Sequence, residues 1–370
     1  MTALHVLLVD DDEESLDLLA ESLPSEVAEH TITWEPCNDF DDAIRRVRER
    51  RYDVVVTDVY RDRTSEAKTP VTGDPRAGDI VASIRGHRFS PILLFTDGTF
   101  PPEYEEGPFL KLADKSRGND AIVQKLSELL GTGIPELARR LHDDLDRTSG
   151  SYVWGFLEDN WASLEEGGLT SLPVLERLLR RRAATQLGRI DPEGGSELQA
   201  VEGAEFYLHP PISDELRLGE IIVGDDDDYR VVLTPHCHLT VQQGAAAPRA
   251  DFVLTLRTVD ARALFADQPI TGSTREKQLD DLRRRLQSPA GFGRPAGRYW
   301  FLPRLLGMKH RFADFLQLES LPYEAIQSGY RPFAVLDVPF AEALQSCFVR
   351  FYSAVGLPIL QPERFEDLLE

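Results

Sequence analysis

Short apolar runs alternate with amphipathic segments along the first 130 residues of the chain. The runs are rich in valine, leucine and isoleucine, and the segments between them repeat their apolar residues at helical spacing. Strands that alternate with helices predict a doubly wound α/β fold, in which helices cover both faces of a parallel sheet. The runs span residues 4–9, 52–59, 91–98 and 108–116, and the helical segments span residues 13–23, 41–50, 78–86 and 119–131.

The pattern changes after residue 131. Residues 134–190 contain three helical segments separated by small or turn-forming residues, which predict a helical connector. Residues 191–370 mix strand patterns, at 220–243 and 251–259, with helical patterns, at 276–288 and 339–356. We therefore expect three parts, namely an α/β domain at 1–131, a connector at 134–190 and a mixed α+β output domain at 191–370.

Composition limits the classes of protein that the chain can represent. The net charge is −22, so the chain cannot gain much affinity from neutralising nucleic-acid phosphates, and the Arg177–Arg182 cluster reads first as a solvated helix face. No apolar run is long enough to span a membrane, and the first residues do not resemble a signal peptide. The three cysteines are scattered, so we expect a cytoplasmic protein without disulfides.

Polar residues follow the apolar runs at the points where the predicted strands end. Asp10 and Asp11 follow the first run, and Asp58, Thr96 and Lys115 end later ones. The carboxyl ends of parallel strands form the ligand-binding edge of such sheets, so we expect these side chains to share one crevice. Carboxylates close together repel one another unless a hard cation lies among them, and Mg²⁺ prefers oxygen ligands. A lysine and a hydroxyl are the groups that a developing phosphoryl charge requires.

These residues occur in motifs that resemble those of bacterial response-regulator receiver domains. The motifs are VLLVDDD, VVVTDV, LLFTDG and ADKS, in that order along the first 130 residues. The resemblance implies a flavodoxin-like sheet of five parallel strands. It also implies that Asp58 accepts a phosphoryl group from a sensor histidine kinase or a phosphotransfer protein.

The resemblance further implies a role for each residue that matches the family's motifs. Mg²⁺ is held by Asp11, Asp58 and the backbone carbonyl of Tyr60, with Asp10 acting through water. Lys115 pairs with the phosphoryl oxygens, and Thr96 moves toward the phosphoryl group when the domain switches.

Several positions depart from the family pattern. The glycine that begins the next helix is Gly78, twenty residues after Asp58, so we expect a long polar loop beside the site. Leu112 stands where the family has an aromatic switch residue, and Asp97 stands where it has a small residue. Lys111 is a rival for the lysine, but it leaves too few residues after Thr96 for the helix that we expect between the two strands, so we favour Lys115.

The densest cluster of reactive side chains in the remainder is His236, Cys237 and His238. Three interpretations compete: a zinc site completed by His209, His310 or an acid, a cysteine hydrolase, or a buried strand with a packed cysteine. Neighbouring residues of a strand point to opposite faces, so a strand offers a metal two of these ligands at best. We favour the buried strand.

Residues 135–362 are also similar to a bacterial domain of unknown function. The similarity lies in VVLTPHCHL, RYWFLP, FADFLQL and FVRFYSAVGLP, although that family more often has an aspartate where His238 stands. It implies no activity. We also find no helix-turn-helix pattern and no phosphate-binding loop, since GFGRPAG at 291–297 lacks the required lysine.

The sequence therefore predicts a response regulator that is phosphorylated on Asp58, needs Mg²⁺, and has an output domain that binds a protein rather than DNA. Two alternatives stay open. One is an enzyme, a hydrolase or metalloenzyme centred on Cys237 and its histidines, that the receiver controls. The other is a scaffold that works without phosphorylation.

Overall fold

The computed structural model describes the chain in two compact units, residues 1–195 and 196–370. Each unit is described by itself. Among the described helices, none combines the length and the apolar character that a bilayer crossing needs. The described residues are 3–59, 77–87, 89–96, 100–187, 201–213, 215–241, 248–287 and 295–353.

The first unit is built on a six-stranded sheet with the order β2-β3-β1-β4-β5-β6. Five strands run parallel, as predicted, but the sheet also has a short antiparallel edge strand, β2, that the sequence analysis did not anticipate. The strands are β1 (Leu4–Val9), β2 (Glu26–Val27), β3 (His30–Cys37), β4 (Val54–Thr57), β5 (Ile92–Thr96) and β6 (Leu110–Asp114).

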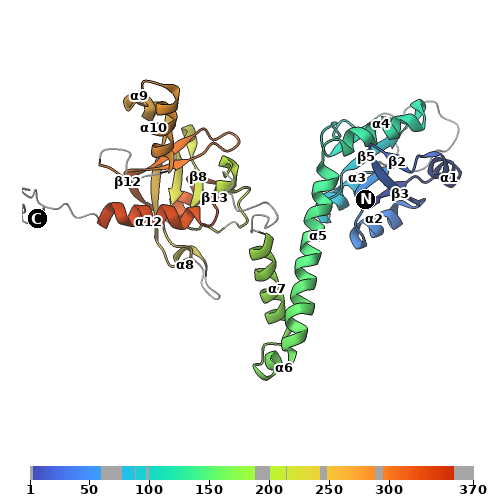
Figure 1. Cartoon of the computed structure of the whole chain (residues 1–370), viewed down its shortest axis with the longest axis horizontal. Coiled ribbons are helices and arrows are strands. Elements are labelled where there is room, and N and C mark those ends of the chain that lie inside the picture. Colours follow the sequence, from blue (N-terminus) through green and yellow to red (C-terminus); the bar gives the residue numbers. More distant parts are fainter. Residues whose placement is uncertain are drawn as a thin grey trace, which may run out of the picture. The chain divides into compact units, whose positions relative to one another are not determined.

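Helices cover both faces of this sheet (Figure 1). Alternate residues of β1 divide between two cores, since Leu8 packs with α1 and α4 and Leu7 packs with α2 and α3. Both side chains are fully buried, which explains why the central strands read as continuous apolar runs. The helices are α1 (Glu13–Ser22), α2 (Phe40–Glu49), α3 (Ala77–His87) and α4 (Asn119–Leu130).

The connection from β5 to β6 corrects the sequence analysis. We expected a helix there, but the described residues of the connection, 100–109, contain none. Prolines at 101, 102 and 108 and a glycine at 107 explain the difference, because proline removes a backbone donor and restricts the residue before it. Tyr104, which is buried, and Phe100 pack instead against the core formed by α2 and α3.

The helical segment that follows forms a hairpin. The first helix, α5 (Ile134–Tyr152), continues through one π-helical turn (Val153–Leu157) into α6 (Glu158–Glu166). Then α7 (Leu172–Leu187) returns alongside α5 (Figure 1). An ion pair from Arg51 to Asp146, with 2.9 Å between Nη1 and Oδ2, joins the α/β part to α5.

The second unit is an antiparallel sheet of seven strands with the order β11-β12-β10-β9-β8-β13-β7. The acidic segment at 225–228 forms the turn between β8 and β9. The strands are β7 (Tyr207–Leu208), β8 (Glu220–Val223), β9 (Tyr229–Val232), β10 (Phe252–Asp260), β11 (Tyr299–Leu302), β12 (Arg311–Pro322) and β13 (Arg331–Leu336).

Helices pack on both faces of this sheet. Leu344 of α12 lies in the larger core with Phe315 of β12, and Leu239 and Ile326 lie in a core on the opposite side of β9. The prediction of a mixed α+β unit is confirmed in this form. The helices are α8 (His236–Leu239), α9 (Ala261–Asp267), α10 (Arg275–Gln287), α11 (Tyr323–Gly329) and α12 (Phe340–Ser353).

The segment TPHCHL is not the buried strand that we favoured. His236, Cys237 and His238 lie in the short helix α8, and all three side chains are exposed. The preceding Pro235 cannot donate to a strand ladder, so β9 ends before it. Only Leu239 of this helix is buried, and it anchors α8 on the sheet.

A buried carboxyl group makes the stability of the second unit depend on pH. Glu220 on β8 is 1% exposed, and its Oε2 accepts a hydrogen bond of 2.9 Å from the backbone N–H of Arg217. Its Oε1 has no hydrogen-bond partner among the described residues. Burial raises the pKa of this carboxyl group to about 7.

We predict that the second unit loses stability as pH rises through this pKa. The folded state holds the Glu220 proton up to about pH 7, whereas the unfolded chain releases it near pH 4.5. The stabilisation is therefore complete below pH 4.5, and about 3 kcal/mol is lost between that pH and pH 8. Hydrogen exchange of β8 and β9 in Glu220→Gln should lack this pH dependence. The same loss in Glu220→Gln and in the wild type would assign the effect to another group.

Candidate phosphoacceptor site

Sheet order brings two carboxylates together at one edge of the first unit. Asp10 follows β1 and Asp58 follows β4, and these strands are direct neighbours with Val9 opposite Thr57. The backbone N–H of Asp58 donates to the carbonyl of Val9 at 2.9 Å, which continues the pairing beyond the strand. Asp10 and Asp58 are 4% and 5% exposed, so both carboxylates lie largely out of water.

A third carboxylate completes an acidic cluster. Asp10, Asp11 and Asp58 each offer an oxygen, and these oxygens all lie within 4.8 Å of one another. Asp12 has a different role, because its side chain accepts from the N–H of Ser15 and caps α1. The cap fixes the start of α1 directly after the acidic turn. The backbone N–H of Asp12 also donates to Asp10 Oδ1 at 3.1 Å.

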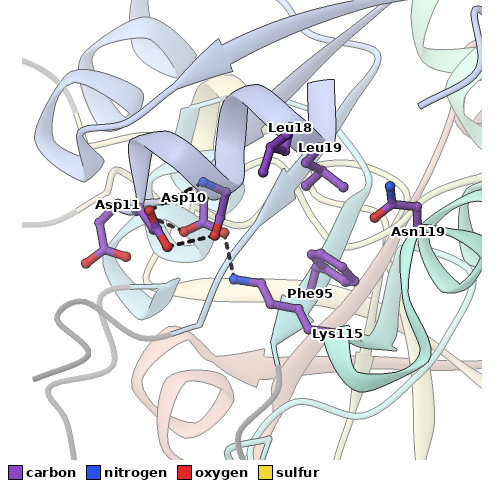
Figure 2. Close-up of a pocket in the computed structure, with 9 residues that line it drawn as sticks. Asp10, Asp11, Leu18, Leu19, Phe95, Lys115 and Asn119 are labelled. Atoms are coloured by element: carbon purple, nitrogen blue, oxygen red, sulfur yellow. Dashed lines mark hydrogen bonds and ion pairs between the residues drawn. The ribbon is translucent and has the colours of Figure 1, made fainter. Parts of the chain in front are cut away.

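Lys115 forms ion pairs with both buried carboxylates. Its Nζ lies 2.6 Å from Asp10 Oδ2 and also contacts Asp58 Oδ2 (Figure 2 shows the contact with Asp10). The lysine lies in a 3₁₀ turn after β6, where the side chain of Asp114 accepts from the N–H of Ser116. This cap holds the turn, so that the lysine reaches toward the ends of β1 and β4.

Burial and ion pairing both shift the pKa values of Asp58 and Lys115. Burial raises the pKa of Asp58, and the nearby Asp10 acts in the same direction, while Lys115 opposes the rise. For Lys115, burial lowers the pKa, but Asp58 and Asp10 outweigh it and the net shift is upward. The lysine therefore stays charged at neutral pH.

Strands β5 and β6 position Thr96 and Lys111, the alternative to Lys115. Thr96 is buried at the carboxyl end of β5, two residues beyond Leu94, which is the register partner of Thr57. Lys111 lies earlier on β6, and its Nζ is 3.7 Å from the carboxylate of Glu128 on α4. The lysine that contacts the two buried acids is thus Lys115, the one that the sequence analysis favoured.

Beside the acids lies a pocket of about 480 Å³ with a partly apolar wall. Leu18, Leu19 and Phe95 line one side of it, and Asn119 closes the far end (Figure 2). The sequence pattern did not indicate that these residues line a pocket. The signal for Phe95 is strand alternation, since it precedes Thr96 and faces the core of α1 and α4. Its ring centroid lies 5.5 Å from Lys115 Nζ, close enough for a cation–π contact.

Some expected features lie outside the described residues. The backbone carbonyl of Tyr60, Asp97 and most of the long loop at 60–78 belong to this group. Gly78 is described, and it lies in the first turn of α3. Leu112, at the position of the family's aromatic residue, is half-buried against the core of α2 and α3.

The second cluster of the sequence analysis does not assemble a metal site. Among the described residues, the acidic cluster of the first unit is the one group of three or more potential ligands within reach of a single ion. His209 Nδ1 instead lies 2.6 Å from the carbonyl of Phe333, and His310 Nδ1 accepts from the N–H of Arg304 at 3.0 Å. The ligand set that we considered around Cys237 is therefore not brought together in the described part of the chain.

Solved structures similar to the chain include three proteins of bacterial signalling. The chemotaxis response regulator CheY4 of Vibrio cholerae is 22% identical, with 35% of this chain and 99% of CheY4 covered at a TM-score of 0.25. A two-component transcriptional regulator AraC from Clostridium phytofermentans is 17% identical, with 37% and 99% covered at a TM-score of 0.28. The anti-anti-sigma factor PhyR from Bartonella quintana is 15% identical, with 35% and 48% covered at a TM-score of 0.24.

No protein-family model matches the chain. No curated protein matches it either. The first unit is therefore characterised by its own sheet order and by the side chains at its carboxyl edge.

We predict that Lys115→Met destabilises the first unit by about 3 kcal/mol, because it leaves two buried carboxylates without a cation. Adding Asp58→Asn removes one of these charges and should recover a large part of the loss. Urea unfolding at pH 8 in the absence of divalent ions, followed by hydrogen exchange of β1 and β4, measures both effects. Equal stability of the wild type and Lys115→Met would show that the ion pairs are not coupled to folding.

Proposed function

We propose that the first unit is a phosphoacceptor domain and that Asp58 forms an aspartyl phosphate. The observation that carries the proposal is the contact of one lysine with two buried carboxylates, Asp10 and Asp58, beside a third, Asp11. A carboxylate can act as a nucleophile toward phosphorus, and such an intermediate splits phosphoryl transfer into two steps. The cluster lies at the edge of the sheet where ligands of this fold class bind.

The donor set fits Mg²⁺. Three carboxylates supply hard oxygen ligands from one side, which leaves the remaining positions of an octahedral ion for water and phosphoryl oxygens. A bound Mg²⁺ would screen the repulsion between the acidic cluster and an incoming phosphoryl group. We propose Asp11 and Asp58 as direct ligands and Asp10 as a ligand through water, with the carbonyl of Tyr60 completing the protein contribution.

The proposed chemistry assigns one task to each side chain. An Asp58 oxygen attacks the phosphorus of a phosphohistidine on a kinase or phosphotransfer protein, a P–O bond forms, and the P–N bond breaks. Lys115 then transfers its pairing from Asp58 to a phosphoryl oxygen, which it can do without moving far. The hydroxyl of Thr96 donates a hydrogen bond to another phosphoryl oxygen.

We further propose that the signal leaves the site through the connection after β5. A change at Thr96 passes directly into residues that, from Phe100 onward, pack without a helix against the core of α2 and α3. An ion pair of 2.8 Å between Glu106 and Lys125 also ties this segment to α4. A loop that holds its position by one buried ring and a few polar contacts can rearrange at lower cost than a packed helix.

The rest of the chain is proposed as the output of a cytoplasmic response regulator. We propose a receiver at residues 1–131, a helical connector at 134–190 and an output domain at 191–370 that binds a protein partner. The net charge of −22 supports a protein partner over nucleic acid, because each phosphate contact needs a cation.

Binding of Mg²⁺ tests the metal part of the proposal. We predict that millimolar Mg²⁺ raises the melting temperature of the wild type, because the ion binds the folded acidic cluster. Asp11→Asn should weaken Mg²⁺ binding about tenfold or more. The matched control is Asp17→Asn, which removes an exposed carboxylate from α1 outside the cluster. Equal Mg²⁺ responses of Asp11→Asn and Asp17→Asn would exclude Asp11 as a ligand.

Phosphorylation is tested by intact mass after incubation with acetyl phosphate and Mg²⁺. We predict a gain of one phosphoryl group in the wild type and none in Asp58→Asn, which keeps the shape of the side chain but removes the nucleophilic charge. Asp53→Asn is the control. Asp53 directly precedes β4, its side chain accepts a hydrogen bond from the N–H of His5, and it lies outside the acidic cluster. Absence of any gain in the wild type, with acetyl phosphate and with a phosphorylated phosphotransfer protein, would favour the scaffold.

A further inference from the structure

A pocket of about 300 Å³ lies in the second unit, at the carboxyl end of β10. Its walls come from the end of that strand, from the first turn of α9 and from the loop at residues 303–310, which joins β11 to β12. This volume is at the lower end of the range for small-molecule sites in proteins. Neither the sequence analysis nor the proposed phosphoacceptor chemistry gives the pocket a role.

Three cationic side chains line this pocket. They are Arg262 of α9 and Arg304 and Lys309 of the 303–310 loop. In the part of the chain that the structure describes, none of the three forms an ion pair, whereas Arg230 and Arg298 of the same unit both pair with carboxylates. The chain as a whole has a net charge of −22, so three unpaired cations around one hollow mark a local site that attracts an anion.

The carboxylate on the pocket wall, that of Asp260, already has partners. Its Oδ1 accepts hydrogen bonds from the backbone N–H groups of Arg262, at 2.8 Å, and Ala263, at 3.1 Å, and so caps α9. Asp260 also interacts electrostatically with Arg311, the first residue of β12. Because this one carboxylate faces three cations, the pocket keeps two positive charges in excess while its histidine is neutral.

The histidine of the pocket, His310, adds a hydrogen-bond donor. Its Nδ1 accepts from the backbone N–H of Arg304 at 3.0 Å, so Nε2 carries the proton of the neutral ring. Partial burial lowers the pKa of His310, and the charges of Arg304 and Arg262 act in the same direction, so the ring is neutral at neutral pH. The effect of both arginines on one imidazole indicates that their guanidinium groups lie near the same ring.

The 303–310 loop is held in place by its own contacts. Leu305 and Met308 exchange two backbone hydrogen bonds, of 3.0 and 2.8 Å, which close the turn. Met308 is 1% exposed and packs in the larger core of the unit, and the N–H of Ala261 donates to the carbonyl of His310 at 2.9 Å. The ring of His310 also stacks on Phe301, with the ring centroids 5.6 Å apart. A ligand therefore meets a backbone that is already ordered, which lowers the entropy cost of binding.

We infer that this pocket binds the phosphoryl group of a small phosphate monoester. Arginine forms paired hydrogen bonds with phosphate oxygens, and Arg262 and Arg304 reach the pocket from two different elements. Lys309 supplies a third charge, and His310 Nε2 supplies a neutral donor. A phosphate monoester carries a charge of about −1.5 to −2 at neutral pH, which matches the excess of positive charge in the pocket.

The remaining space in the pocket favours an organic phosphate over the free ion. At about 30 Å³ for each water molecule, the pocket has the volume of roughly ten waters, which is more than a phosphoryl group fills. Leu306 and Met308 on its wall offer apolar surface to the organic part of the ligand. The inference does not depend on phosphorylation of Asp58, because no residue of the pocket belongs to the acidic cluster.

Titration of the full chain with phenyl phosphate, followed by NMR of the histidine side chains, tests the inference. The signal of His310, assigned by its loss in His310→Gln, should shift and saturate with a dissociation constant of about 1 mM. The signals of His236 and His238, which are exposed on α8, should not move. The same result is expected without Mg²⁺ and in Asp58→Asn, so a failure here is distinct from a failure of the phosphoacceptor chemistry. A His310 signal that stays in place with phenyl phosphate and with inorganic phosphate at high millimolar concentration overturns the inference.

Charge removal tests which side chains hold the phosphoryl group. Arg304→Gln with Lys309→Gln should weaken binding of phenyl phosphate about tenfold or more, because two of the three cations are lost. The matched control, Arg275→Gln with Lys277→Gln, removes the same charges from exposed positions on α10 and should leave the affinity unchanged. Equal weakening by the two pairs would show a general effect of net charge and contradict the proposal. Benzoate that binds as tightly as phenyl phosphate would contradict the choice of a phosphoryl group, and inorganic phosphate that does so would contradict the organic part.

Discussion

The sharing of Lys115 by two buried carboxylates is the constraint on which the first unit depends. Asp10 and Asp58 are held side by side because β1 and β4 are neighbours, and neither can reach water to relieve the repulsion. The neutralising charge must come from β6, which is separated from β4 by β5. The capped 3₁₀ turn after β6 and the ring of Phe95 on β5 guide the lysine across that distance. Much of the local structure at this edge therefore serves the placement of one charge.

The same charge balance gives the site its capacity to respond. One lysine cannot neutralise three carboxylates, so the site retains negative charge that favours binding of a divalent cation. Repulsion among the carboxylates destabilises the site in the absence of a divalent cation. Binding of an ion, or the proposed addition of a phosphoryl group, would change this repulsion. In the proposed mechanism, residues 100–109 transmit such a change, because they pack through Tyr104 and Phe100 rather than through a helix.

The second unit has a different physical basis. Its antiparallel sheet buries polar side chains in pairs, as in the two hydrogen bonds from Arg298 to the fully buried Asp314 and the contacts of Arg230 with Asp228 and Glu319. These pairs satisfy their own charges and lie within the strand framework. They therefore contribute to a defined fold.

The sequence by itself determined the periodic features. Burial on both faces makes the central strands continuous apolar runs, so β1, β4 and β5 and the residues that end them could be recognised without coordinates. It also supplied Asp10, Asp11, Asp58, Thr96 and Lys115, because strand ends in a parallel sheet share one edge. It did not reveal the edge strand β2 or the strand β3, whose mixed polarity reflects partial exposure.

Tertiary structure decided what depends on contacts between distant segments. Whether Lys111 or Lys115 meets Asp58 depends on where β6 ends, and the missing helix before β6 made residue counting unreliable. The exposure of Cys237 depends on Pro235 ending β9, which turned a sequence with strand-like neighbours into a short helix. The incomplete burial of α7, which has no buried residue, could not be inferred from its leucines, since the same spacing describes a helix packed in a core. Burial is a property of the assembled neighbours, and periodicity records only which face is available for it.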